Sequence, residues 1–133
     1  MNGTACKVYS KREDGEKKVS TNFRVREFAC QDGSDAIVIA DKLVQILQSI
    51  RNHFGQPVTI NSAYRTPEHN KKVGGSATSQ HLYGTAADIV VAGVYPSDVA
   101  DYVELIMPNT GGIGRYRDFT HIDVRTKKSR FVG

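Results

Sequence analysis

The stretch SQHLYGTAADI, residues 79–89, keeps neither a helical nor a strand period along its length. His81 comes before Gly84, where the chain can turn sharply, and Asp88 follows in the hydrophobic run AADIVV. An ionised carboxylate in a buried strand has to be paired or bind a metal, and the small residues Ala86 and Ala87 leave room around it. The stretch therefore predicts half of a metal site. The other interpretation is that Asp88 ends a strand and accepts backbone N–H bonds.

The second half of such a site is expected at His121, within DFTHIDVR (118–125). A catalytic zinc ion needs three protein ligands and an open fourth position. His81, Asp88 and His121 would supply them if their strands lie together, which the spacing alone does not prove. A histidine on a polar strand face remains the alternative for His121. His53, near a helix end, and His69, in a short polar helix, are expected to be structural or surface residues.

Acids and a cation lie close to these histidines in the sequence. Asp118 is three residues before His121, and Asp123 is two residues after it on the same inferred strand face. Either could be the base that takes a proton from a metal-bound water, and Asp123 could instead orient His121 through its second nitrogen. Either could equally be a surface acid. Arg65 ends a predicted strand in the same region and could hold a carboxylate or an oxyanion.

Apolar spacing predicts an α+β domain. The predicted order is helix, strand, short helix, strand, helix and two closing strands, which favours an antiparallel or mixed central sheet with helices packed on it. The first helix is expected to begin after Ser34 or Asp35 and to end at Gly55, the short helix to be capped by Thr66, and the last to begin at Pro96. Strands are expected over residues 58–65, 86–93, 111–116 and 118–125.

The 133 residues fit one domain, divided here into a polar, loosely ordered segment, 1–20, and a folded domain, 21–133. The formal charge of +4 fits an anionic polymer partner, either nucleic acid or cell wall. Much of it lies in KREDGEKK and RTKKSR near the two ends, where solvated tails are expected, so a nucleic-acid interface is not predicted. Cys6 and Cys30 match no zinc or redox motif and are expected to stay reduced.

No apolar run has membrane-spanning length, and the N-terminal residues are polar where a signal peptide would be apolar. We therefore expect the chain to be made in the cytoplasm without a signal peptide and to have no membrane partner.

The stretch 79–89 also matches the pattern Ser-x-His-x-x-Gly-x-Ala-x-Asp at every fixed position. It resembles the zinc-binding signature of the peptidase M15 family, which includes D-alanyl-D-alanine carboxypeptidases and phage L-alanyl-D-glutamate endolysins. INSAYRT (60–66) is similar to the arginine segment of that family, and GGIGRY with FTHIDVR to its closing strands. The resemblance runs from Phe23 to Arg125 and is greatest to the small single-domain branch.

This resemblance implies a fold like that of Hedgehog and DD-peptidase domains, with one Zn²⁺ held by His81, Asp88 and His121. It implies Arg65 as a substrate or oxyanion contact and Ser79 as a loop residue beside the substrate. Some members have an acid where Asp118 lies, and the small branch has the His-x-Asp pattern of His121 and Asp123, so both acids stay candidates for the base and Asp118 is favoured.

The function implied is hydrolysis of peptide bonds in peptidoglycan stem peptides, by a monomer that reaches the cell wall after release from the cell. Related folds also bind zinc without peptidase activity. The alternative is therefore an inactive, zinc-stabilised module that binds the cell wall or a protein.

Overall fold

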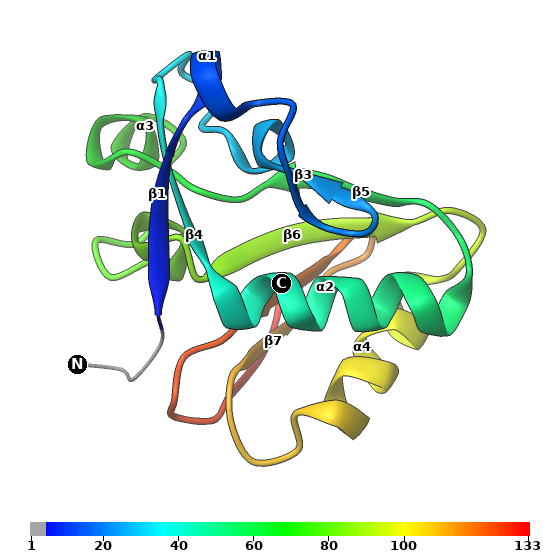
Figure 1. Cartoon of the computed structure of the whole chain (residues 1–133). Coiled ribbons are helices and arrows are strands. Elements are labelled where there is room, and N and C mark those ends of the chain that lie inside the picture. The colour runs from blue at the N-terminus through cyan, green and yellow to red at the C-terminus, as the bar shows by residue number, and fades with distance from the viewer. Residues whose placement is uncertain (1–4) are drawn as a thin grey trace.

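Strand β6 (Ala86–Val91) lies inside a five-stranded sheet in the computed structural model, which describes residues 5–133 (Figure 1). It pairs antiparallel with β5 (Val58–Ser62) and with β8 (Thr120–Asp123). Strand β7 (Gly112–Arg115) is antiparallel to β8, and β9 (Ser129–Val132) is parallel to β7. The sheet, in the order β5-β6-β8-β7-β9, is therefore mixed, as the sequence predicted.

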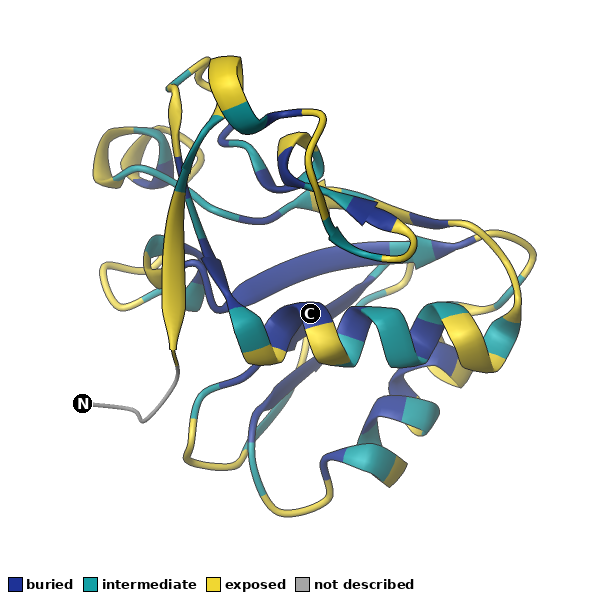
Figure 2. Ribbon diagram, viewed as in Figure 1, coloured by how far each residue is buried: buried dark blue, intermediate teal, exposed yellow. Residues whose placement is uncertain are grey.

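Two helices cover one face of this sheet. Helix α2 (Asp41–Phe54) contacts β6, and α4 (Pro96–Ile106) contacts β6, β7 and β8. Alternation along β6 sends Ala87, Ile89 and Val91 into the core with these helices. Figure 2 shows that β6 is buried along most of its length, and only Val90 is partly exposed. The same alternation places Ala86 and Asp88 on the opposite face, where the site lies.

The remaining elements are short. The N-terminal part contains β1 (Cys6–Ser10), α1 (Lys11–Asp14), β2 (Lys18–Ser20), β3 (Phe23–Arg24), the 3-10 helix η1 (Val25–Phe28) and β4 (Ala36–Ala40). Helix α3 (Pro67–Lys72) and the 3-10 helix η2 (Gln80–Tyr83) lie between β5 and β6. The segment 1–20, expected to be loosely ordered, thus forms regular elements from residue 6 onward; residues 1–4 lie outside the described part. The boundary at residue 20 between segment and domain stays a prediction.

The predicted start of the first long helix was wrong. Residues 36–40 form β4, which pairs antiparallel with β1, and the helix begins only at Asp41. The sequence AIVIA contains β-branched residues that fit a strand, and Ile37 and Ile39 are buried on one face while Val38 is partly exposed. The helical spacing noted in the sequence holds only from residue 40 onward. The end at Gly55, in the left-handed conformation, is confirmed.

The expectation of a solvated C-terminal tail was also wrong. Residues 129–132 form β9, and the Arg130 guanidinium binds the Glu104 carboxylate and the backbone carbonyls of Met107 and Gly111. The basic run therefore contains the start of an edge strand that Arg130 ties to the end of α4, and its other arginine, Arg125, is bonded to Asp123.

The predicted cap of α3 and the predicted start of α4 are confirmed. The Thr66 side chain caps α3 by accepting from the His69 N–H, and α4 begins at Pro96. No disulfide joins Cys6, which is exposed, to Cys30, which is buried. Within residues 5–133, no helix is both long and apolar enough to cross a membrane.

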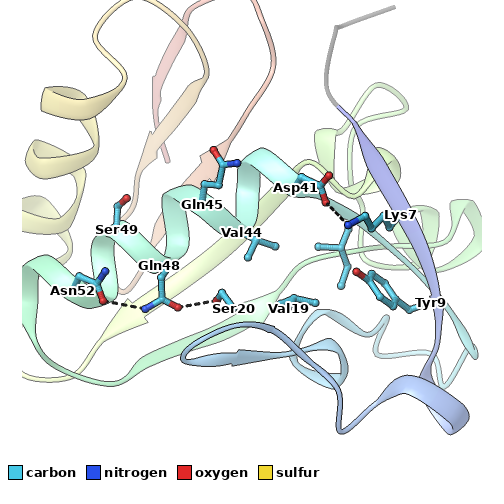
Figure 3. Close-up of a pocket in the computed structure, with 11 residues that line it drawn as sticks. Lys7, Tyr9, Val19, Ser20, Asp41, Val44, Gln45, Gln48, Ser49 and Asn52 are labelled. Atoms are coloured by element: carbon cyan, nitrogen blue, oxygen red, sulfur yellow. Dashed lines mark hydrogen bonds and ion pairs between the residues drawn. The ribbon is translucent and has the colours of Figure 1, made fainter.

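A cavity of about 490 Å³ lies between the N-terminal strands and α2, away from the site face (Figure 3). Two interactions join residues that line it. Lys7 and Asp41 form an ion pair with 3.8 Å between Nζ and Oδ1, and Ser20 donates to Gln48 over 2.7 Å. This cavity shares no lining residue with the site described next.

Candidate metal centre

The register of β6 against β8 brings the two strand residues of the site together. Asp88 and His121 are direct partners in the antiparallel pair, so their Cβ atoms lie about 5 Å apart. The His121 Nδ1 atom is 2.9 Å from Asp88 Oδ1. Ala86 lies opposite Asp123, in the next pair on the same face of the sheet, and is too small to obstruct either Asp88 or Asp123. Of the two alanines expected to leave room around Asp88, only Ala86 lies on this face, because Ala87 points into the core.

His81 reaches the same carboxylate from the loop before β6. Its backbone N–H donates to the Ser79 side chain, which caps η2, and Gly84 turns the chain with a φ of 72°. The His81 Nδ1–H group donates to the Ala63 carbonyl oxygen over 2.6 Å, because that oxygen can only accept. The Nε2 atom is left facing Asp88 Oδ2 at 3.3 Å.

His121 is held in a matching way by Asp123. The Nε2–H group of His121 donates to Asp123 Oδ2 over 2.8 Å, and Arg125 donates to both carboxylate oxygens from Nε and Nη2 over 2.7 Å. The Asp123 side chain is fully buried. This is the arrangement of a residue that orients a ligating histidine, because it leaves Nδ1 for a metal. Which of Asp118 and Asp123 is the base stays a prediction.

The pKa values of these groups follow from burial and from their bonds. Burial opposes the ionisation of Asp88, but hydrogen bonds from His121 and His81 hold its pKa well below the ordinary range. Burial lowers the pKa of His121, while bonds to Asp123 and Asp88 outweigh that effect and raise it. The Arg125 and His121 bonds likewise hold the pKa of buried Asp123 low. The site therefore keeps two carboxylates charged beside two imidazoles.

One ligand atom from each of His81, Asp88 and His121 lies within 4.8 Å of the other two. Two imidazole nitrogens and one carboxylate oxygen are donors that zinc accepts, and three protein ligands leave a fourth position for water or substrate. Both histidines already have their other nitrogen bonded to an acceptor, as ligating histidines usually do. The three residues fit a catalytic divalent metal.

A cavity of about 470 Å³ opens above this cluster. Ser79 lines it, as does Arg65, whose guanidinium donates to Ser62 and Asn70 and has its Nη2 atom 3.8 Å from Asp88 Oδ2. Asp118 is exposed in the turn between β7 and β8 and is not among the residues that line the cavity. The structure thus gathers the predicted ligands, Arg65 and Ser79, and leaves Asp118 at the surface.

Several residues of the site were not predicted. Tyr116 and Phe119 stack with 4.3 Å between ring centroids, and Phe131 of β9 lies 5.2 Å from the His121 ring; together they form an aromatic wall of the cavity. Gly112 and Gly114 lie opposite Asp123 and His121. A Cβ atom at Gly112 would overlap the Asp123 carboxylate, and one at Gly114 would overlap the Phe131 ring. The alternating glycines of GGIG were the signal for this space.

Comparison with known proteins agrees with the geometry. The profile of the family described as Peptidase M15 matches residues 20–123. Over 94 residues, the chain is 41% identical to the zinc D-Ala-D-Ala carboxypeptidase of Streptomyces albus G. That alignment covers 65% of this chain and only 37% of the relative. Because the family match spans most of the sequence and contains His81, Asp88 and His121 together, the protein belongs to the peptidase M15 family.

Proposed function

We propose that the protein is a zinc metallopeptidase that hydrolyses peptide bonds in peptidoglycan stem peptides. The observation that carries this proposal is the convergence of His81, Asp88 and His121 at the floor of an open cavity with a guanidinium beside it. The name of the Streptomyces relative supports both zinc and a D-Ala-D-Ala peptide as substrate. The substrate of this chain and the bond that it cuts are both part of the proposal.

Each residue of the site has a distinct proposed role. His81 Nε2, Asp88 and His121 Nδ1 would hold the metal, while Ala63 and Asp123 fix the two rings. When bound, zinc would supply a Lewis acid and would lower the pKa of a coordinated water to about 7. Arg65 would hold a peptide carboxylate or the oxyanion that develops at the carbonyl. The aromatic wall would exclude water from one side of the peptide.

Of the two candidate bases, Asp118 and Asp123, Asp118 is favoured; it would accept a proton on its carboxylate and pass it to the leaving amine. It lies in the turn between β7 and β8, flanked in the sequence by Tyr116 and Phe119, which line one side of the cavity. In the described structure its carboxylate is at the surface, so this role requires the turn to bring it toward the metal when substrate binds.

The test is digestion of purified muropeptides by the zinc-loaded protein, with products identified by mass spectrometry. We expect cleavage by the native sequence, and loss of cleavage and of bound zinc in His81→Ala. His69→Ala is the matched control, because His69 lies in α3, belongs to neither the cluster nor the cavity lining, and should keep both properties. Full cleavage by His81→Ala would show the mechanism to be wrong.

One observation favours a second candidate, a zinc-stabilised module that binds the wall without cutting it. Among the described residues that line the cavity, Asp88 is the only acid, and it is one of the predicted ligands. Asp118→Asn separates the two functions. The peptidase is supported if this variant loses turnover and retains zinc. The module is supported if the native protein binds muropeptides without cutting them and the variant binds them equally well.

We also propose that the protein acts as a monomer on the cell wall after release from the cell, with neither nucleic acid nor membrane as a partner. Size-exclusion chromatography with light scattering tests the monomer, and sedimentation with purified wall sacculi tests the partner. A stable dimer, or no wall association, would contradict these two statements.

A further inference from the structure

We propose that Asn70 is a positioning residue, which fixes the guanidinium of Arg65 beside the metal cluster and leaves its positive charge for the substrate. Asn70 belongs to α3, is 4% exposed and does not line the metal cavity. It therefore acts through Arg65 and does not touch a substrate. The inference rests on the proposed function, in which Arg65 holds a peptide carboxylate or an oxyanion.

The three nitrogens of the Arg65 guanidinium face three different elements. Nε donates to the Ser62 hydroxyl of β5 and Nη1 donates to the Asn70 side-chain oxygen of α3, each over 3.3 Å. Nη2 lies 3.8 Å from Asp88 Oδ2 and makes no hydrogen bond within residues 5–133. Two bonds thus fix the plane of the guanidinium, and the nitrogen nearest the predicted ligands is left to donate to a substrate.

The orientation of the Asn70 carboxamide follows from its second bond. Its Nδ2–H group donates to the Ser76 carbonyl oxygen over 2.9 Å, and a carbonyl oxygen can only accept. The side-chain oxygen of Asn70 is therefore the atom that faces Arg65. The backbone carbonyl of Asn70 also accepts from the Gly75 N–H over 2.8 Å. Asn70 thus joins Arg65 to a loop whose residues Gly75 and Ser76 line the metal cavity.

Gly75 leaves the space that this contact needs. A Cβ atom at this position would overlap the Asn70 side-chain oxygen and would lie 3.2 Å from Arg65 Nη1. The backbone conformation does not explain the residue, because the left-handed glycine of this pair is Gly74, with a φ of 76°. The contact between Asn70 and Arg65 accounts for the second glycine.

The neutrality of Asn70 decides what Arg65 can do. Ser62 and Asn70 hold the guanidinium with uncharged acceptors, so its positive charge is not neutralised by the groups that fix it. In the described part of the chain, the one acid within ion-pair distance of Arg65 is Asp88, which is a predicted metal ligand. A carboxylate in place of the Asn70 amide would pair with the guanidinium and compete with an anionic substrate group for it.

The experiment is a double-mutant cycle on the cleavage of purified muropeptides by the zinc-loaded protein. We expect Asn70→Ala to lower kcat/KM by about 10- to 100-fold and to bind zinc as the native protein does. In the Arg65→Ala background the same substitution should have little further effect, because no guanidinium is left to position. Asn61→Ala is the matched control and should keep the native kcat/KM. Asn61 is exposed in β5, and its side chain makes no hydrogen bond within residues 5–133.

Asn70→Asp tests the role of the charge, and it also serves if Asn70→Ala does not fold. The carboxylate has the size of the amide and can accept from Arg65, but it neutralises the guanidinium. We expect it to lower kcat/KM about tenfold in the native background and to have little effect in the Arg65→Ala background. Native kcat/KM in either Asn70 variant, or losses that add to that of Arg65→Ala, would overturn the inference.

A native protein that cuts no muropeptide would contradict the proposed peptidase and still leave the positioning role open to test. Calorimetric titration of the zinc-loaded protein with the same muropeptides then replaces turnover in the cycle. Binding that is weaker in Asn70→Ala, with no further loss in the Arg65→Ala background, supports the role. Unchanged or additive losses reject it, and a native protein that binds no muropeptide rejects both proposals.

Discussion

At the scale of single residues, the most informative contact is that between Asp123 and His121. A histidine ring has two nitrogens. The hydrogen bond that one nitrogen makes to the protein determines which nitrogen is left to bind a metal. Here the buried Asp123 carboxylate takes the Nε2–H of His121 and is itself held by Arg125. The His-x-Asp pair in the sequence therefore predicts a ligand and its support.

We expect Asp123→Asn to lower zinc affinity by about 10- to 100-fold. The amide can accept from His121 but cannot pair with the Arg125 cation, so the imidazole is held less well. Competition with a fluorescent chelator measures the affinity. Asp118→Asn is the control and should bind zinc as the native protein does; equal affinity in both variants would contradict the orienting role.

Gly112 limits the same contact from the neighbouring strand. A methyl group there would occupy the space of the Asp123 carboxylate. We expect Gly112→Ala to destabilise the fold by about 1–3 kcal/mol, as overpacking does, and to weaken zinc binding. Urea denaturation of the metal-free protein measures the loss of stability separately from the change in zinc binding. An unchanged midpoint would show that the strands can move apart to accept the methyl group.

At the scale of elements, helix α3 is fastened at its start. Asp32 accepts from the Ser34 N–H over 2.9 Å and from the Thr66 hydroxyl over 2.7 Å, and hydrogen bonds with the Ser34 side chain, Thr66 and the Ser34 backbone hold the pKa of Asp32 below its ordinary value of 3.8. A carboxyl group whose pKa is lower in the folded than in the unfolded state stabilises the fold at pH values above its unfolded pKa. This stabilisation is lost as the pH falls through the folded pKa.

We therefore expect the native protein to lose more stability than Asp32→Asn when the pH falls below about 4. Chemical denaturation from about pH 6 to about pH 3 measures this difference. Parallel curves for the two proteins over that range would show that Asp32 does not contribute to the acid sensitivity of the fold.

Strand β9 depends on Arg130 for its position. The guanidinium is bonded to Glu104 of α4 and to carbonyls at the end of that helix, so it ties the edge strand to the helical layer. We expect Arg130→Ala to cost about 1–3 kcal/mol of unfolding free energy, because it removes charge-assisted bonds from partly buried partners. Thermal unfolding of Arg130→Ala beside Lys128→Ala, an exposed neighbour that should be neutral, measures it.

Local signals predicted some elements and failed for others for physical reasons. The cap of α3 and the end of α2 follow from Thr66 and Gly55, whose effects are local. Strand β4 was read as helix because its stability comes from pairing with β1, about thirty residues earlier, which no local pattern reports. The convergence of Asp88 and His121 likewise depends on strand register, and only the family resemblance predicted it.

At the scale of the whole molecule, metal and fold should be coupled. The ligands come from β6, β8 and the loop before β6, so a metal that binds only the folded chain stabilises all three together. With free zinc at about 100 times its dissociation constant, we expect about 2.7 kcal/mol of added stability. Thermal unfolding with zinc and with a chelator measures it, and His81→Ala should show no difference between the two.

The pairing of Asp88 with His121 has a further consequence for how the chain folds. Side chains alternate across a strand, so a slip of one residue between β6 and β8 would turn one of the two ligands toward the helices. Misregistered molecules would keep a hydrophobic strand and lose the metal. In a refolding mixture the proposed zinc ion would bind only correctly paired chains, and it would therefore shift the population away from the mispaired ones.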